Sequence, residues 1–206
     1  MEENKESSLQ TLTEIRQLME RSSRFISLSG LSGVAAGVYA IIGAFAAYLH
    51  LGLTGLGYNA ELRLNYNDLR FIVIDALVVL TLAITTGILL TTQKARKDGN
   101  SIFDSTARKL VINLCIPLAT GGLICIAFLY HGAFYYIPSC MLVFYGLSLV
   151  HASSYTRNDI RSLGFAEIIL GLISLFTLEN PFLFWVIGFG ILHIVYGTYM
   201  YFKYER

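Results

Sequence analysis

The sequence predicts an all-α protein, an integral membrane bundle of six transmembrane helices preceded by a cytoplasmic amphipathic helix, with both termini cytoplasmic. Charged residues make up 14% of the 206 residues and hydrophobic residues 55%, whereas soluble domains carry roughly 25% charged residues. Six apolar stretches are long enough to cross a hydrocarbon layer of about 30 Å. Nearly every Lys and Arg falls on one side of the hairpins that these stretches would form.

The six predicted spans lie near residues 25–49, 71–92, 110–130, 134–152, 163–178 and 182–202. Lipid offers no hydrogen-bond partners to backbone amides, so each span is expected to be helical. The fifth span is the shortest. It must borrow residues from Arg161 onward, lie in a thinned bilayer, or rest against longer neighbours. Neither long loop is large enough for a domain, so residues 25–206 are predicted to form one transmembrane domain.

The basic residues predict how the bundle is oriented. Thirteen of the 15 Lys and Arg residues lie in the N-terminal segment, in the loops after the second and fourth spans, and in the C-terminal tail. The other side holds only Arg63 and Arg70. Because basic residues concentrate on the cytoplasmic side of membrane proteins, both termini are expected in the cytoplasm.

Residues 1–24 are too polar for a cleavable signal peptide. Ser7 and Gln10 have the spacing of a helix capping box. Apolar residues then recur at three- and four-residue steps, which predicts an amphipathic helix. This helix either lies on the inner membrane surface or the bundle, or docks another copy or a cytoplasmic partner. The apolar positions are Leu9, Leu12, Ile15, Leu18 and Met19.

The charge of the chain bears on its partners. A net charge of +1 argues against nucleic acid, because phosphate binding needs a clustered excess of Lys and Arg. The basic group Lys94, Arg96 and Lys97 is expected to meet anionic lipid headgroups or to set the topology. The predicted partner is therefore the lipid bilayer, and no motif indicates a cofactor.

An internal repeat relates the last four spans. Gly122-Leu-Ile opens a stretch that ends in Tyr145-Gly146, and Gly171-Leu-Ile opens one that ends in Tyr196-Gly197. Both copies point the same way, which predicts two hairpins related by an axis along the membrane normal.

The last hairpin, from Gly171 through the Asn180-Pro181 turn to Val186-Ile-Gly-Phe-Gly190 and Gly197, resembles the two-helix repeat of the HdeD-like family of small six-span bacterial membrane proteins. The resemblance covers about 40 residues, and loosely the third and fourth spans. It implies a bacterial cytoplasmic membrane protein linked to stress or acid tolerance. It supplies no catalytic residues.

Ionisable side chains inside a span are costly, so each is a functional candidate. Counting about 1.5 Å per residue places His193 near the midplane of the sixth span. Its neighbour Tyr196 is on the same helix face. His193 is either a satisfied core histidine or a proton-responsive site.

The other three ionisable candidates lie nearer the surfaces. By the same count, Glu167 and His151 lie about a turn from the inner surface and Asp75 about a turn from the outer one. Glu167 and His151 are expected to pair with each other or with arginines of the inner loop, either as a clamp or in proton or ion handling. Asp75 is expected to pair with an arginine of the outer interface. These arginines are Arg157 and Arg161 on the inner side and Arg63 and Arg70 on the outer.

Glycines and one proline predict how the helices pack. Small residues on one face let backbones approach closely, either inside the monomer or between copies, and a homodimer through the first span is one expectation. Pro117 should bend the third helix, and a bent helix near His193 would line a cavity. The predicted packing faces are Ser29, Gly33 and Gly37 in the first span, and Gly188, Gly190 and Gly197 in the sixth.

The cysteines and histidines suggest no metal site. Cys115, Cys125 and Cys140 lie within two apolar spans and are expected to be free thiols, although Cys125 and Cys140 share a depth. The histidines are scattered without metal-ligand spacing.

No nucleophile elbow, phosphate loop or paired catalytic carboxylates occur in the sequence, which predicts a protein that is not an enzyme. The favoured function is a sensing or scaffold module in the membrane. The first alternative is a small transporter or channel whose path passes His193, Glu167 and Pro117. The second is an enzyme acting on a lipid, for which His151, Glu167 and Arg161 are the only plausible set.

Overall fold

The computed structural model describes residues 29–52, 65–97, 105–177 and 179–206. The predicted amphipathic helix of residues 1–24 lies outside these ranges. The described residues are helical and contain no strand. Their elements are α2 (Gly30–Leu51), α3 (Tyr66–Lys97), α4 (Ser105–Tyr130), η3 (Phe134–Tyr136), α5 (Ile137–Ala152), η4 (Ser153–Tyr155), α6 (Asp159–Phe176), α7 (Pro181–Trp185), η5 (Val186–Leu192) and α8 (His193–Tyr204).

Five helical segments within the described ranges are long and apolar enough to cross a membrane. The predicted all-helical class is confirmed for the described residues, and these five segments indicate an integral membrane protein. The shortest predicted span corresponds to α6, which is not among the five; its 18 residues carry Asp159, Arg161 and Glu167. The five segments are Gly30–Leu51, Tyr66–Lys97, Ser105–Tyr130, Phe134–Tyr155 and Pro181–Tyr204.

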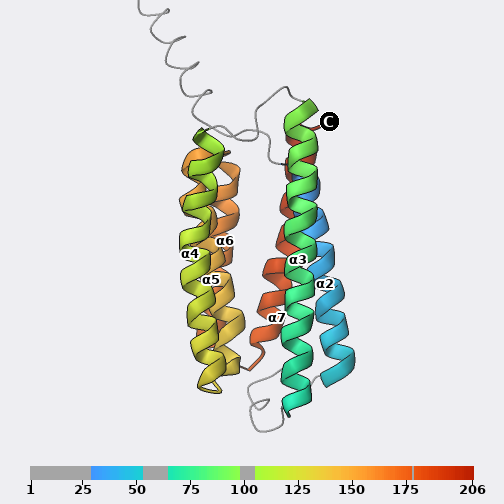
Figure 1. Cartoon of the computed structure of the whole chain (residues 1–206), viewed down its shortest axis with the longest axis vertical. Helices are drawn as coiled ribbons and strands as arrows, with labels where there is room; N and C mark the ends of the chain where they lie inside the picture. Colours follow the sequence, from blue (N-terminus) through green and yellow to red (C-terminus); the bar gives the residue numbers. More distant parts are fainter. Residues whose placement is uncertain (1–28, 53–64, 98–104, 178) are drawn as a thin grey trace, which may run out of the picture.

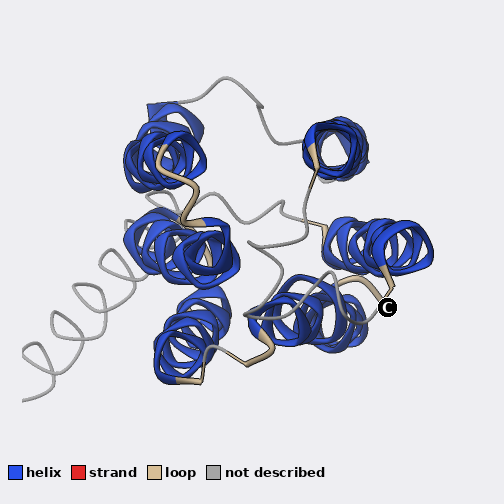
Figure 2. Ribbon diagram, turned by 90° about the horizontal axis from the view of Figure 1, so that it is seen from below, coloured by secondary structure: helices blue, strands red, loops and turns tan. Residues whose placement is uncertain are grey.

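The helices form two groups joined by the last hairpin. Figure 1 shows α4, α5 and α6 gathered on one side and α2 and α3 on the other, with α7 between them. The strongest contacts join α5 to α6, α4 to α5, α2 to α3, and α8 to α2, while α7 and η5 contact α6. Viewed end-on, the helices follow one another in an open arc (Figure 2). Its two ends are α3 and α4, which share no extensive contact within the described residues.

The surface of this arc is apolar, as lipid requires. The apolar part of α3 has no buried residue, and only 11% of the corresponding part of α4 is buried inside the protein. Large apolar side chains such as Leu77, Ile88 and Leu123 are more than half exposed. In water such a surface would drive aggregation, so a bilayer is the solvent that fits it.

Of the predicted glycine faces, Gly33 and Gly37 of α2 meet Gly197 of α8 and Gly190 of η5. A Cβ atom built on Gly33 would lie 3.2 Å from the Cα of Gly197, and one on Gly37 would lie 2.6 Å from the carbonyl oxygen of Gly190. Backbones this close leave no room for a side chain. The face of α2 on which the sequence suggested a second copy is therefore filled by α8 of the same chain.

The helix α4 runs unbroken through Pro117. Pro117 lacks the N–H that would bond to the carbonyl one turn earlier, and the Thr120 hydroxyl donates to the Ile116 carbonyl at 2.9 Å. From the sequence, the helix around Pro117 was expected to line a cavity near His193. Instead α4 packs on α5, while His193 lies on α8.

Candidate functional site

Glu167 is buried in the middle of the bundle. It is the ninth of the 18 residues of α6, and none of its surface is exposed. The sequence placed it about a turn from the inner surface because the fifth span was expected to begin near residue 163. The helix begins four residues earlier, at Asp159, so Glu167 lies about two turns from the start of α6.

His193 reaches the same place from the last hairpin. It is the first residue of α8 and follows the π-helix η5. Its Nδ1 lies 2.9 Å from the Gly188 carbonyl oxygen. A carbonyl oxygen only accepts, so Nδ1 carries the proton in this hydrogen bond. In the neutral imidazole Nε2 then accepts, and the Tyr145 hydroxyl, 2.8 Å away, donates to it.

Glu167 and His193 form a close but incompletely bonded pair. Oε1 of Glu167 lies 3.4 Å from Nδ1 of His193, but neither carboxyl oxygen has a hydrogen-bond partner among the described residues. The reason is that Nδ1 directs its hydrogen to Gly188. A buried charge without hydrogen bonds costs several kcal/mol. The pair is therefore a place where gaining or losing one proton changes the local energy strongly.

Gly188, within the π-helix η5, leaves the space for this pair. A Cβ atom built on Gly188 would lie 2.5 Å from Oε2 of Glu167, so any larger residue would collide with the carboxyl group. Single π-turns inside α-helices occur frequently at functional sites. The sequence singled out Gly188 for packing, but it gave no signal for the π-turn.

Aromatic rings surround the imidazole. The Phe189 ring lies 5.7 Å from the His193 ring and 5.2 Å from the Trp185 ring. Tyr196, one turn beyond His193, has a buried hydroxyl without a hydrogen-bond partner in the described structure. Tyr145 was not predicted as a site residue, although it occupies the same repeat position as Tyr196, and that equivalence was the available signal.

The remaining predicted candidates lie elsewhere. His151 is exposed near the end of α5 and does not pair with Glu167, so that predicted pairing was wrong. Asp75 lies on α3, where its carboxylate would be 3.2 Å from a Cβ atom built on Gly43 of α2. The structure thus brings Glu167 together with His193, and it leaves His151 and Asp75 apart from them.

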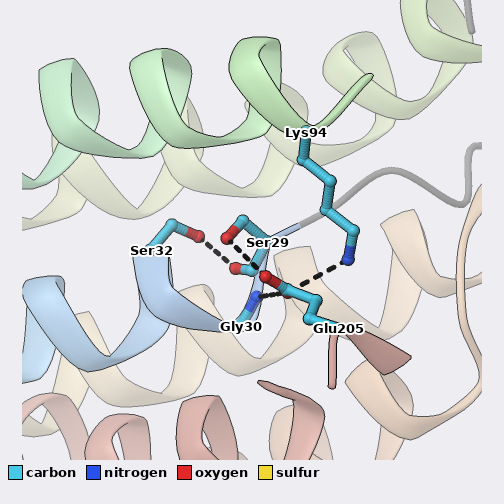
Figure 3. Close-up of polar contacts among 5 residues, drawn as sticks. All are labelled: Ser29, Gly30, Ser32, Lys94 and Glu205. Carbon is cyan, nitrogen blue, oxygen red and sulfur yellow. Dashed lines mark hydrogen bonds and ion pairs between the residues drawn. The ribbon is translucent and has the colours of Figure 1, made fainter. Parts of the chain in front are cut away.

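A second polar cluster gathers at the end of the bundle where Asp159 begins α6, called here the charged end. The Glu205 carboxylate accepts hydrogen bonds from the Gly30 backbone N–H and, at 3.3 Å, from the Ser29 hydroxyl. It also lies 3.0 Å from Nζ of Lys94 (Figure 3). An acceptor at a helix N-terminus satisfies an otherwise unbonded N–H and complements the helix dipole. Glu205 therefore ties α2 and α3 to the end of α8.

Lys94 was expected to meet lipid headgroups or to set the topology, and the structure gives it an ion pair with Glu205. Its side chain and that of Glu205 are each only 12% exposed. Water screens such a pair less than one on the open surface. Lys94 thus serves the packing of three helices inside the protein.

Replacing Glu205 by glutamine should lower the stability of the folded protein. The amide keeps the acceptor oxygen but loses the charge that attracts Lys94 and the α2 terminus, which we expect to cost about 1 to 2 kcal/mol. Thermal unfolding in detergent, followed by circular dichroism, measures the loss. Glu179→Gln, a change at an exposed acid, should leave the midpoint unchanged, and an equal effect of both variants would contradict the role of Glu205.

Asp159 joins α6 to the end of α8 beside this cluster. Its carboxylate accepts hydrogen bonds from Lys203 Nζ at 2.9 Å and from the Tyr204 hydroxyl, and the Arg157 guanidinium lies 3.5 Å from the centre of the Tyr204 ring. Partial burial alone would raise the pKa of Asp159, but the two hydrogen bonds and the nearby cations outweigh it and lower the pKa. The folded protein therefore favours the ionised form.

A lowered pKa in the folded state gives stability that is complete above the pKa of the unfolded chain and is lost as the pH falls through the folded value. Asp159→Asn should therefore melt at a lower temperature than the wild type at neutral pH, and the difference should shrink in acid. Melting curves across this pH range check the prediction. A difference that stays constant or grows in acid would contradict it.

The remaining reactive groups are the cysteines and the possible metal ligands. Cys115, Cys125 and Cys140 are free thiols, and those of Cys125 and Cys140 are hydrogen-bonded to each other across α4 and α5. Within the described ranges, no group of three or more histidine, cysteine or acidic residues is arranged to hold a metal ion.

Comparisons with protein-family models, with curated proteins and with solved structures find no match to this chain. Its function therefore has to be argued from its own residues.

Proposed function

We propose that this protein is a non-enzymatic, six-span membrane protein that responds to proton concentration through Glu167 and His193. One observation carries the proposal. A fully buried carboxyl group without hydrogen-bond partners among the described residues lies 3.4 Å from a buried imidazole. Buried ionisable groups inside membrane helices are expensive and mark functional sites, and histidine is the side chain that changes charge near neutral pH.

The proposed topology adds α6, the fifth helix along the chain to cross, to the other five spans, which makes six. Its 18 residues extend about 27 Å at 1.5 Å per residue, close to the thickness of the hydrocarbon layer. It packs along α5, and Glu167, the charged residue in its middle, is fully buried. With six spans both termini lie on one side, and the excess of basic residues at the charged end supports the cytoplasm for that side.

A response to protons fits the site better than transport of a solute. Glu167 and His193 are 0% and 5% exposed, and they contact each other and Tyr145. A side chain that only gains or loses a proton can function in such a closed site. A transported solute would need a cavity beside these side chains. The lipid-enzyme alternative required Glu167 to converge with His151, and these two residues are apart.

The proton would act through the hydrogen bonds of His193. When the imidazole is neutral, Tyr145 donates to Nε2; when it is protonated, Nε2 must donate to the Tyr145 oxygen instead. Nδ1 remains bonded to Gly188, and Glu167 then faces a positive charge. The site joins α5, α6 and α8, so this reversal changes the preferred packing of three helices. The role in acid tolerance that the resemblance of the last hairpin implies is compatible with such a response.

Trp185 offers a direct test, because it is the chain's only tryptophan and its ring contacts Phe189, which contacts the His193 ring. We expect the fluorescence of the purified protein in lipid nanodiscs to change along a single titration curve as the pH is varied. Circular dichroism should show that the helices persist throughout. A flat fluorescence profile in the intact protein would refute the proposed function.

A further inference from the structure

Polar side chains follow the seam where α5, α6 and α8 meet, from one end of the bundle to the other. Towards the end opposite the charged end, the hydroxyls of Ser139 and Ser174 bond to each other at 2.7 Å, and neither residue is exposed. Glu167 and His193 occupy the middle. Tyr196 comes next, and the Asp159 cluster lies at the charged end. The seam thus offers two routes by which a proton could reach Glu167.

The route from the serine pair is blocked by Leu142. This residue lies on α5 one turn after Ser139 and is fully buried. A Cβ atom built on Gly171 would lie 2.9 Å from the Cβ of Leu142, and one built on Gly188 would overlap the end of the Leu142 side chain. Leu142 therefore fills the space between the serine pair and Glu167 with apolar atoms, which neither accept nor pass a proton.

The route from the charged end contains a polar group without a partner. The Tyr196 hydroxyl is buried and unbonded within the described structure, and it lies one turn beyond His193 on the way to the charged end. It interacts electrostatically with Asp159 and Arg157. An unsatisfied buried hydroxyl costs about 1 to 3 kcal/mol, so its retention calls for an explanation beyond packing.

We propose that Glu167 and His193 exchange their proton with the charged end only, through the Tyr196 hydroxyl, and that Leu142 closes the opposite route. In the transfer, the Tyr196 oxygen accepts a proton from a hydronium ion at the charged end and its hydroxyl releases its own proton to the imidazole or the carboxylate, so tyrosine is left unchanged. Because no described side chain is within hydrogen-bond distance of this hydroxyl, a water has to bridge it to the pair. The titratable groups at the pair are Tyr145 from α5, Glu167 from α6 and His193 from the last hairpin, and Tyr196 follows one turn further along α8. This inference rests on the proposed function and adds the side from which the proton comes.

The test is a rapid pH jump on one side of a membrane. The full chain is reconstituted in liposomes that are sorted by the accessibility of a C-terminal tag, and Trp185 fluorescence is followed after the jump. We expect a fast change when the charged end faces the jump. When the opposite end faces it, the change should be at least tenfold slower, because it waits for protons to leak through the bilayer.

Two variants test the residues of the route. Tyr196→Phe should slow the fast change at least tenfold and leave its amplitude and midpoint pH unaltered, since phenylalanine keeps the ring but cannot pass a proton. Tyr199→Phe, on the half-exposed face of the same helix, is the control and should behave like the wild type. Leu142→Ala should make the response fast from both sides, because the cavity joins the serine pair to Glu167, whereas Leu147→Ala at an exposed position should not.

The outcomes separate this inference from the proposed function. An equally fast wild-type response from both sides, or an unchanged rate in Tyr196→Phe, would overturn the one-sided route while leaving a proton response intact. The absence of any response from either side would overturn the proposed function itself. If Leu142→Ala does not fold, the Tyr196→Phe rate and the wild-type sidedness still decide the question.

Discussion

Glu167→Gln should abolish the pH-dependent change in Trp185 fluorescence. The amide has nearly the shape of the carboxyl group but carries no charge, so a protonated His193 would be a buried cation without a counter-ion and the imidazole stays neutral. The space beside Gly188 stays filled. The helix content should stay the same, because no buried charge is created. The same titration of the variant in nanodiscs measures the effect.

Asp75→Asn is the matched control for this experiment. Asp75 is also an acid within a predicted span, but it lies on α3 beside Gly43, in the other group of helices. Its replacement should leave the titration curve of the wild type in place. If the response survived in Glu167→Gln, or disappeared equally in Asp75→Asn, the response to pH would not depend specifically on Glu167.

Gly197→Leu should produce the largest loss of stability among changes outside the site. A Cβ atom on Gly197 would lie 2.6 Å from the Gly30 carbonyl oxygen and 2.6 Å from the Val34 amide nitrogen. Both are backbone atoms, so the side chain can be accommodated only by pushing α8 away from α2. Overpacking of this kind costs about 3 kcal/mol or more. The variant should melt well below the wild type in detergent, or fail to elute as a single species.

Gly122→Leu provides the control with the same change in side chain. A Cβ atom on Gly122 meets nothing within 4 Å, and leucine has a higher helix propensity than glycine. This variant should melt at the same temperature as the wild type or slightly above it. Similar losses in both variants would show that leucine itself, rather than the contact between α2 and α8, is responsible.

The fold class could be predicted because lipid imposes a simple rule on sequence. Long apolar runs must become helices in a bilayer, and five of them do so by length and composition. The glycines that allow a close approach could also be identified, because Gly33 and Gly197 expose the backbone, but the sequence left open whether they pack inside the monomer or between copies. These predictions depend on residues within a single helix, where spacing alone determines which side chains share a face.

The site depended on features that a single span does not reveal. The start of α6 at Asp159 moved Glu167 to mid-depth, because polar side chains at its first turn are bonded to the end of α8 instead of ending the helix. His193 directly follows the π-helix η5, and helical spacing in the sequence cannot foresee such a turn. The ion pair of Lys94 could not be predicted, because Glu205 is distant in the sequence. Glu205 comes near Lys94 only when the first and last helices pack together.

The position of His193 suggests how a local proton could affect the whole bundle. It begins α8, and the last residues of that helix contact both groups of helices. Lys203 and Tyr204 hold Asp159 of α6, while Glu205 holds Gly30 of α2 and Lys94 of α3. A shift of α8 caused at His193 is therefore transmitted to both groups of helices. The hydrogen bonds and ion pairs at the end of α8 are the contacts that such a shift would change.

The most direct test of a buried proton site is infrared difference spectroscopy of the protein in lipid between acidic and alkaline pH. We expect an imidazolium band to appear in acid together with a shift of a buried carboxylate band, and we expect this signal to disappear in Glu167→Gln and to remain in Asp75→Asn. A spectrum that lacks this signal across the titration, or one that keeps it unchanged in Glu167→Gln, would contradict the account.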